Sequence, residues 1–285
     1  MPIPVPDSLD ARLDTLAVRL GELGSVLVAF SGGVDSAFLL AAAVRALGSG
    51  RVAAATAVSP SLPGAEIAPA REFAADVGVT HLLPRTAELE RAGYRANAGD
   101  RCRFCKAELL DVLVPLAAGL GFAHVATGTN ADDATAGFRP GIRAARERGA
   151  VTPLLDAGLT KDQVRAASRR WGLPTWDKPA AACLSSRVAF GIPITAFRLS
   201  RVDRAEHGLR AALTQAGIAV RDLRVRDLGD SARIEVDPDA VAQVQHCTAA
   251  HDAVSGAGFR RVAVDPRGFR SGAMNELLTD PERYR

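Results

Sequence analysis

The sequence predicts an α/β fold in which a parallel sheet carries helices on both faces, followed by a smaller α/β domain. Three observations support this. Short apolar runs alternate with helical patterns through residues 8–127, the first run ends in a glycine-rich loop that leads into a helix, and the pattern changes after residue 192. Short strands that are apolar throughout belong in a sheet buried on both faces, which is the parallel arrangement.

The first half of the chain supplies the elements of a Rossmann-like sheet. Apolar residues with helical spacing predict helices over residues 8–23, 34–47, 64–77, 105–116 and 160–171. Short apolar runs predict strands over residues 25–30, 52–58, 81–84 and 123–127. The last of these helices begins with Thr160-Lys161-Asp162-Gln163, which has the form of a capping box.

The second half changes in pattern. We expect helices over residues 197–216 and 240–250, and strands over residues 223–228, 232–236 and 259–264. The first two of these strands are joined by Gly229-Asp230-Ser231, which is typical of a hairpin turn. We place the boundary between the domains within residues 180–192, so that residues 1–185 form the first domain and residues 186–285 the second.

Composition limits the function classes. The 285 residues are 48% hydrophobic and 24% charged, with a net charge of +3, which is too small an excess to indicate a nucleic-acid partner. The sequence has neither an apolar run of the ~20 residues that span a membrane nor the pattern of a signal peptide. We therefore expect a cytoplasmic protein. Only three of its 35 basic residues are lysines, Lys106, Lys161 and Lys178.

The strongest local signal is Ser31-Gly32-Gly33-Val34-Asp35-Ser36, which joins the first strand to its helix. Two glycines let the backbone approach an anion, and the following helix adds N-terminal amides and partial positive charge. Ser31 and Ser36 can add hydroxyl donors, whereas Asp35 would repel a phosphate and is expected to hold the loop or a Mg²⁺ ion. The loop matches neither the Walker A pattern nor G-x-G-x-x-G. The alternative is a plain strand–helix turn with a serine cap.

A second polar segment, Thr127-Gly128-Thr129-Asn130-Ala131-Asp132-Asp133, follows the last predicted strand of the first sheet. Ligands of open α/β sheets bind at the carboxyl ends of strands, so we expect this segment beside the glycine loop. The paired carboxylates Asp132 and Asp133 suit Mg²⁺, which bridges phosphate oxygens. The alternative is a loop in which Asn130 or Asp132 caps a helix.

The four cysteines are a C-x-x-C formed by Cys102 and Cys105, a distant Cys183, and Cys247. A zinc ribbon needs a second C-x-x-C, and a thioredoxin-like site would use the C-x-x-C alone. Three cysteines also suit a [4Fe–4S] cluster held by three thiolates, with one iron open to a ligand. A disulfide is not expected in a reducing cytoplasm, and two cysteines one helical turn apart also occur by chance. We expect Cys247, on an amphipathic helix, to pack in the core.

The glycine loop resembles the PP-loop of the ATP pyrophosphatases, which cut ATP between its α and β phosphates and transfer AMP to a carboxylate or carbonyl oxygen. Further segments resemble one family of that superfamily, the LarE family, and the resemblance covers nearly the whole chain. The matching segments are residues 99–106, 128–133, 139–141, 176–187 and 268–276. The resemblance implies that the first domain has the adenine nucleotide alpha hydrolase-like fold and that the protein is an oligomer.

The LarE resemblance implies an ATP-dependent sulfur transferase that acts in the synthesis of the nickel-pincer nucleotide cofactor of lactate racemase. A carboxylate of pyridinium-3,5-biscarboxylic acid mononucleotide would be adenylated with release of pyrophosphate, and sulfur would then displace AMP. In one branch of the family a sacrificial cysteine, which matches Cys183, becomes dehydroalanine. In another branch, three cysteines carry a [4Fe–4S] cluster whose free iron holds a sulfide. Cysteines at all three positions make this chain resemble the second branch.

The same resemblance implies roles for individual residues. The candidate catalytic residues are Cys183, Cys102, Cys105, Lys106 and Lys178. The candidate ATP-binding residues are Ser31, Gly32, Gly33, Asp35, Ser36, Thr129, Asp132 and Asp133, together with Mg²⁺. A substrate that carries a phosphate and carboxylates is expected to contact arginines, and the candidates are Arg139, Arg187, Arg224 and Arg226. Arg224 and Arg226 alternate along one strand and so share a face. Glu206 and Glu235 are candidate ligands of a divalent ion.

Three other functions compete with this reading. A tRNA thiolation enzyme also uses a PP-loop and cysteines, but it should carry a strongly basic face or an added RNA-binding domain. An amide-forming synthetase such as NAD or GMP synthetase would not need the cysteines. A nucleotide-sensing module without catalytic activity would not need three thiols either.

Overall fold

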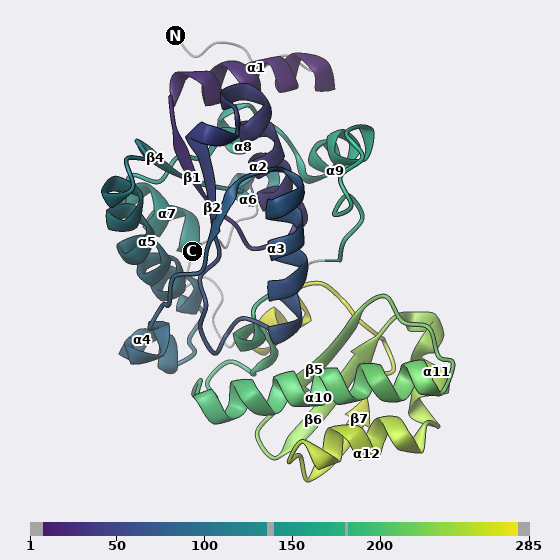
Figure 1. The fold of residues 1–285 in the computed structure, drawn as a ribbon. Helices are drawn as coiled ribbons and strands as arrows, with labels where there is room; N and C mark the ends of the chain where they lie inside the picture. The colour runs from purple at the N-terminus through teal and green to yellow at the C-terminus, as the bar shows by residue number, and fades with distance from the viewer. Residues whose placement is uncertain (1–7, 136–139, 180–181, 279–285) are drawn as a thin grey trace.

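The computed structural model describes residues 8–135, 140–179 and 182–278. It has two parts, one above the other in Figure 1, each built around its own sheet. The larger part contains a four-stranded sheet in the order β3-β2-β1-β4, and all of its strand pairs are parallel. Its strands are β1 (Val26–Ala29), β2 (Val52–Ala55), β3 (Thr80–Leu82) and β4 (His124–Thr127). The predicted α/β class with a parallel sheet is confirmed.

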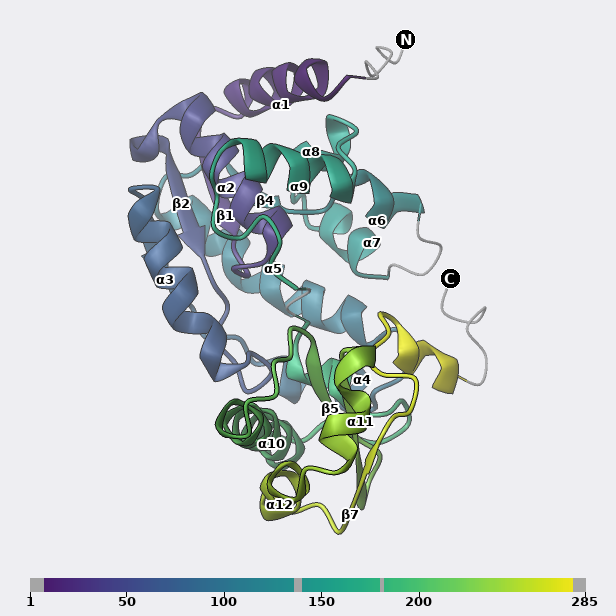
Figure 2. The ribbon, with the colours of Figure 1, turned by 90° about the vertical axis from the view of Figure 1, so that its right-hand side faces the viewer.

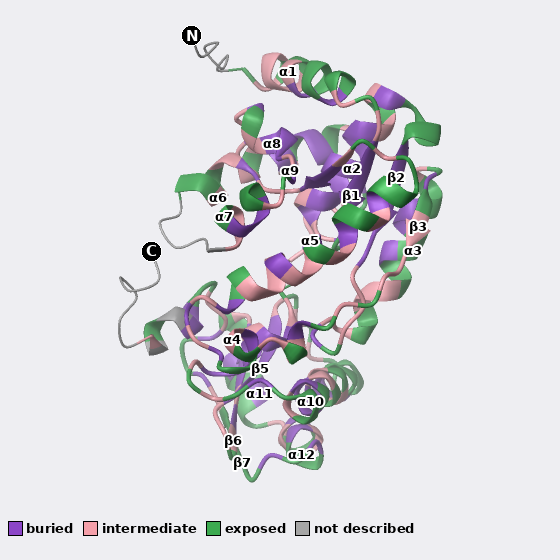
Figure 3. Cartoon of the chain, turned by 90° about the vertical axis from the view of Figure 1, so that its left-hand side faces the viewer, coloured by how far each residue is buried: buried purple, intermediate pink, exposed green. Residues whose placement is uncertain are grey.

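The parallel sheet is covered on both faces because successive residues of its central strand point in opposite directions. Val26 and Val28 of β1 belong to a core that includes side chains of α1 (Leu9–Glu22), α2 (Val34–Leu47), α3 (Ile67–Asp76) and α9 (Lys161–Arg170). Leu27 belongs to a separate core with α5 (Arg101–Gly119) and α7 (Pro140–Glu147). Figure 3 shows β1 and β2 as almost wholly buried.

Shorter elements connect these helices and strands. They are η1 (Ser49–Arg51), η2 (Gly64–Glu66), η3 (Glu88–Glu90), α4 (Ala92–Arg95), α6 (Ala131–Thr135) and α8 (Pro153–Asp156). The predicted capping box at the start of α9 is present, since the Thr160 hydroxyl accepts from the Gln163 amide and the Gln163 side chain accepts from the Thr160 amide.

The smaller part is a mixed three-stranded sheet with two helices packed side by side, as Figure 2 shows at its lower edge. Strands β5 (Leu223–Asp227) and β6 (Ser231–Val236) form the predicted antiparallel hairpin, and β7 (Arg261–Val264) runs parallel to β6. The helices are α10 (Ala196–Gln215) and α12 (Thr248–Gly256), with the shorter η4 (Leu184–Arg187), η5 (Pro238–Ala240), α11 (Val241–Gln245) and η6 (Ala273–Leu277).

The prediction of one continuous helix over residues 240–250 is wrong. The chain breaks between α11 and α12, where Cys247 has extended backbone angles and precedes the first residue of α12. His246, Cys247 and Thr248 are all weak helix formers, so nothing local opposes the break. Cys247 packs against the core of the smaller part, as expected, and is partly buried.

The two parts share a core at their junction. Tyr94 of α4, together with Phe104 and Cys105 of α5, packs with the apolar side chains of the smaller part. The boundary predicted at residues 185/186 falls inside η4, which lies at this junction. In the described ranges no helix combines the length and apolar character that crossing a membrane requires.

Candidate active site

The glycine loop between β1 and α2 is held by the hydroxyl of Ser36. This hydroxyl accepts from the Ser31 amide at 3.2 Å and donates to the Gly33 carbonyl at 3.1 Å, which folds the loop back over the first turn of α2. Gly32 has a φ of +71°, a conformation that glycine adopts without strain. Ser31, Gly33, Asp35 and Ser36 line a cavity. The loop therefore presents backbone amides and hydroxyls to one end of that cavity.

Strand β4 ends against this loop, and Gly128 is the point of closest approach. A Cβ atom built on Gly128 would lie 2.9 Å from the Ser36 amide nitrogen, closer than real Cβ atoms approach a backbone. Only glycine fits there without displacing the first turn of α2. Thr129, predicted to bind ATP, also lines the cavity.

Asp35 is held from two directions, and one of its partners was not predicted. Lys161, the first residue of α9, forms an ion pair with the Asp35 carboxylate. The side-chain amide of Asn130 donates to the same carboxylate at 3.2 Å. Lysine is rare in this chain, which drew attention to Lys161. The position of Lys161, far along the chain from the glycine loop, gave no reason to place it there. The contact puts a flexible cation at the glycine loop.

The predicted carboxylate pair Asp132 and Asp133 is divided by the structure. Asp133 lines the cavity, and its carboxylate accepts from the backbone amide of Asn130 at 3.2 Å. Asp132 is exposed and accepts from the backbone amide of Lys161 at 2.7 Å, so it caps the start of α9. The two carboxylates therefore do not face one ion together, because neighbouring residues of α6 point in different directions. The alternative of a helix cap in this loop applies to Asn130, whose side-chain oxygen accepts from the Asp133 backbone amide at 3.1 Å at the start of α6.

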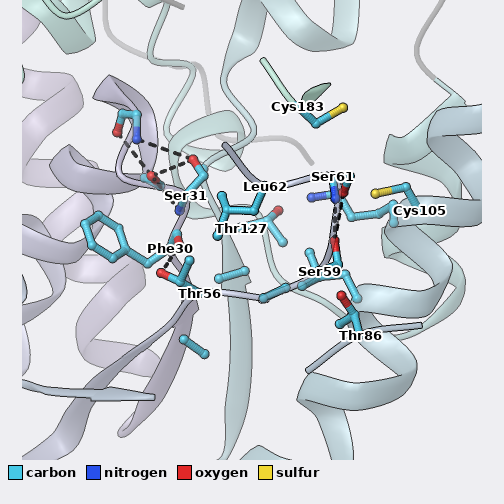
Figure 4. Close-up of a pocket in the computed structure, with 18 of the residues that line it drawn as sticks. Phe30, Ser31, Thr56, Ser59, Ser61, Leu62, Thr86, Cys105, Thr127 and Cys183 are labelled. Atoms are coloured by element: carbon cyan, nitrogen blue, oxygen red, sulfur yellow. Dashed lines mark hydrogen bonds between the residues drawn. The ribbon is translucent and has the colours of Figure 1, made fainter. Parts of the chain in front are cut away.

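The cavity has a volume of about 390 Å³ and runs from the glycine loop to two of the predicted thiols. Figure 4 shows Ser31 on one side and Cys105 and Cys183 on the other. Lys106 also lines it, as do several polar side chains that were not predicted, Ser59, Ser61, Thr86 and Glu88. The structure thus joins the glycine loop to two cysteine segments that are far apart in the sequence.

The three candidate thiols are not equivalent. Cys105 is half-buried, and burial, followed by the negative charge of a Cys183 thiolate, raises the pKa of its thiol. Cys183 is half-buried at the same end of the cavity. Cys102 is exposed one turn earlier in α5 and does not line the cavity. Within the described residues, no three histidine, cysteine or acidic side chains are already arranged to hold a metal.

The two predicted catalytic lysines lie in different places. Burial lowers the pKa of Lys106, against the opposing charges of Cys105, Cys102 and Asp133. Lys178 does not line the thiol cavity. Its ammonium donates to the Gly32 carbonyl at 3.0 Å and pairs with Glu66 at 2.6 Å, behind the glycine loop.

The predicted substrate arginines line two hollows on the far side of the Cys183 segment. Arg187 and Arg224 line a cleft of about 740 Å³ together with Lys178. Arg224 and Arg226 share a pocket of about 140 Å³, as their alternation along β5 predicted. The Arg224 guanidinium lies 5.2 Å from the ring centre of Phe269, and burial, with Arg187 nearby, lowers its pKa. Arg139 lies outside the described residues.

The two glutamates predicted to hold a divalent ion form ion pairs with arginines instead. Glu206 accepts from Arg187 and from the Val225 amide, both at 3.0 Å. Glu235 is fully buried and pairs with Arg226 at 2.6 Å and with Arg233 at 2.9 Å. Their oxygens orient guanidinium groups in this structure, and their role as ligands of a divalent ion stays a prediction.

Comparison with known proteins identifies the family. No family model matches the chain. The chain is 33% identical over 276 residues to the pyridinium-3,5-bisthiocarboxylic acid mononucleotide synthase of Lactiplantibacillus plantarum. The aligned region covers 95% of this chain and 96% of that protein. The chain belongs to this family, the LarE family. An uncharacterized protein of Synechocystis sp. is 42% identical over 274 residues, or 95% of this chain and 99% of that protein.

In this LarE-family chain, a buried network that was not predicted ties the two cysteine segments together. Arg101, which precedes Cys102, donates to the Ser185 carbonyl at 2.8 Å and also bonds to Asn97. The Tyr94 hydroxyl forms a hydrogen bond with the Ser185 hydroxyl at 2.5 Å. The pKa of Tyr94 is raised, mainly by burial and then by the negative charge of a Cys183 thiolate. These bonds fix the segment after Cys183 against the start of α5.

Proposed function

We propose that this chain is an ATP-dependent sulfur transferase that converts a carboxylate of pyridinium-3,5-biscarboxylic acid mononucleotide into a thiocarboxylate. The observation that carries the proposal is the single cavity that holds a phosphate-binding loop at one end and two thiols at the other. Adenylation and sulfur attack take place at the same carboxyl group, so both sets of groups must reach one site. The name of the L. plantarum relative supports the product.

In the first step, a carboxylate oxygen of the substrate attacks the α-phosphorus of ATP. The bond from that phosphorus to the bridging oxygen breaks, and pyrophosphate leaves with the electron pair. The amides of the glycine loop and the hydroxyls of Ser31 and Ser36 would hold the departing pyrophosphate. Asp133, one of the carboxylates on the cavity wall, would hold a Mg²⁺ ion, which would supply positive charge against the pyrophosphate.

In the second step, hydrosulfide attacks the carboxyl carbon of the acyl adenylate. The bond from this carbon to the AMP oxygen breaks, AMP leaves, and one proton is released to give the thiocarboxylate. AMP is a better leaving group than a carboxylate oxygen, which is why the first step is needed. Lys106, half-buried next to Cys105 on the cavity wall, would place its amino group beside the incoming sulfur.

Three thiolates, those of Cys102, Cys105 and Cys183, would hold a [4Fe–4S] cluster. Their donor chemistry fits such a group, and Cys105 and Cys183 already face the same cavity. Cys102 is one helical turn from Cys105 and has to turn inward to join them. When bound, the cluster would supply an open iron on which the sulfur to be transferred is held.

The substrate phosphate would lie against the arginines beyond the Cys183 segment. Arg224 and Arg226 share a pocket with the Ser186 side chain, and Arg187 is held by Glu206 in the adjoining cleft. A substrate that spans from these arginines past Cys183 would place its ring at the thiol end of the cavity. The cytoplasmic location and the oligomeric state remain predictions.

The test is turnover under anaerobic conditions with ATP, Mg²⁺, sulfide and the biscarboxylic mononucleotide. We expect equal amounts of AMP and pyrophosphate, and a product in which sulfur replaces oxygen, detected by mass spectrometry. Release of ADP and phosphate would show that the glycine loop acts on a different bond of ATP. Tight binding of tRNA in a gel-shift assay, with no turnover of the mononucleotide, would favour tRNA thiolation instead.

A further inference from the structure

Glu88 is a buried carboxylate at the thiol end of the cavity. It is the first residue of η3, is 3% exposed, and lines the cavity that Cys105 and Cys183 share. The hydroxyls of Ser59 and Ser61 both donate to one of its oxygens, the second at 2.5 Å. Neither donor carries a charge, and across the described ranges no lysine, arginine or histidine forms an ion pair with Glu88.

The other deeply buried acidic side chains are treated differently by this chain. Asp227, which is fully buried, pairs with Arg198 at 2.9 Å and with Arg201 at 2.5 Å. Glu235 pairs with Arg226 and Arg233. A buried charge without a partner is costly, and these two carboxylates each have two guanidinium partners. Glu88 faces the cavity instead of a guanidinium group, so we expect a ligand in the cavity to supply the positive charge that neutralises its carboxylate.

The position of Glu88 indicates which ligand this is. Two other carboxylates line the cavity, and both lie at the glycine loop, where Asp35 pairs with Lys161 and Asp133 accepts from the Asn130 backbone amide. The substrate of the proposed function carries a fixed positive charge on its ring nitrogen, in the same ring as the carboxyl groups that must reach the thiols. A ring placed for sulfur attack therefore brings its charge to the end of the cavity that Glu88 occupies.

We propose that Glu88 binds the pyridinium cation of the substrate and selects a positively charged ring over an uncharged one. This rests on the proposed function for the identity of the substrate. The two serine hydroxyls hold one carboxylate oxygen and thereby fix the side chain, which leaves the other oxygen for the ring. Selection follows because an uncharged ring would bury the carboxylate without neutralising it.

The experiment compares two mononucleotides that differ only in ring charge. One is the pyridinium-3,5-biscarboxylic mononucleotide, and the other is its C-nucleotide analogue, in which carbon replaces the ring nitrogen. Binding is measured by calorimetry without ATP, so that no chemistry occurs. Wild type should prefer the pyridinium compound by about tenfold or more, as the attraction between a buried carboxylate and a nearby cation implies. Glu88→Gln, which keeps an acceptor for the serines, should lose most of this preference.

The matched control is Glu90→Gln, which removes an exposed carboxylate from the same 3₁₀ helix and should behave like wild type. Thermal melting of each variant checks that the fold is kept. Equal binding of the two compounds by wild type would overturn the role of Glu88 and leave the proposed function intact. The proposed role of Glu88 is also wrong if Glu88→Gln weakens binding of a non-hydrolysable ATP analogue and leaves binding of the pyridinium compound unchanged. If wild type binds neither mononucleotide, the proposed function itself fails, and the role of Glu88 fails with it.

Discussion

Lys161 and Asp35 form an ion pair that links the first residue of α9 to the glycine loop, although they lie in distant parts of the sequence. The pair keeps the Asp35 carboxylate neutralised at the mouth of the phosphate site. In the proposed function, we expect the ammonium group of Lys161 to reach the phosphates of ATP while Asn130 still holds Asp35. We therefore expect Lys161 to act on ATP as well as on the loop.

Replacing Lys161 with methionine should weaken ATP binding. The change removes a cation worth a charge-assisted hydrogen bond and leaves Asp35 to repel the phosphates, so we expect the KM for ATP to rise about tenfold or more. Lys161→Arg should restore part of the loss. The measurement is AMP formation as a function of ATP concentration. An unchanged KM in Lys161→Met would show that the lysine only supports the loop.

Gly128→Ala should disrupt both folding and nucleotide binding. The added methyl group would overlap the backbone at Ser36, so β4 or the first turn of α2 must shift. The control is Gly21→Ala in α1, where a Cβ atom meets nothing within 4 Å and alanine should stabilise the helix by about 0.5–1 kcal/mol. Chemical denaturation and ATP binding measure both variants. Normal ATP binding by Gly128→Ala would contradict the close approach.

Replacing the two arginines of β5 should have different effects, one mainly on the free energy of unfolding and the other mainly on substrate binding. Arg226→Ala leaves the fully buried Glu235 with Arg233 as its remaining partner, and we expect a loss of about 3 kcal/mol of stability. The Arg224 guanidinium lies over the Phe269 ring in a pocket, and Arg224→Ala should mainly weaken binding of the mononucleotide. Denaturation curves and calorimetry with the mononucleotide test the two effects. Equal losses of stability in both variants would contradict this division.

The three thiols distinguish a cluster from a sacrificial cysteine. If all three hold a [4Fe–4S] cluster, Cys102→Ala, Cys105→Ala and Cys183→Ala should each lose iron in anaerobic preparations, while Cys247→Ala should keep it. If Cys183 alone gives up its sulfur, wild type should contain no iron and should carry dehydroalanine at position 183 after one turnover. Iron analysis and intact-protein mass spectrometry distinguish these outcomes.

The sequence by itself determined the α/β class, the glycine loop and the family resemblance. These features are local. Strand and helix patterns repeat within a few residues, and Ser31–Ser36 folds its loop through bonds among its own members. The family resemblance also depends on short segments that can be matched without knowing where they lie in space. Even the hairpin of β5 and β6 could be predicted, because its turn lies between the two strands.

The tertiary structure alone decided which side chains face the cavity. Asp132 and Asp133 are adjacent in sequence, yet Asp132 accepts from the Lys161 amide at the start of α9 and Asp133 lines the cavity. Glu206 meets Arg187 because α10 packs against η4, and Glu235 meets Arg226 because β6 pairs with β5. Glu88 lies beside the thiols because η3 packs against α5 and because the Leu184 amide, next to Cys183, donates to the Ser61 carbonyl. Such neighbours are set by long-range packing, which leaves no pattern within a short stretch of sequence.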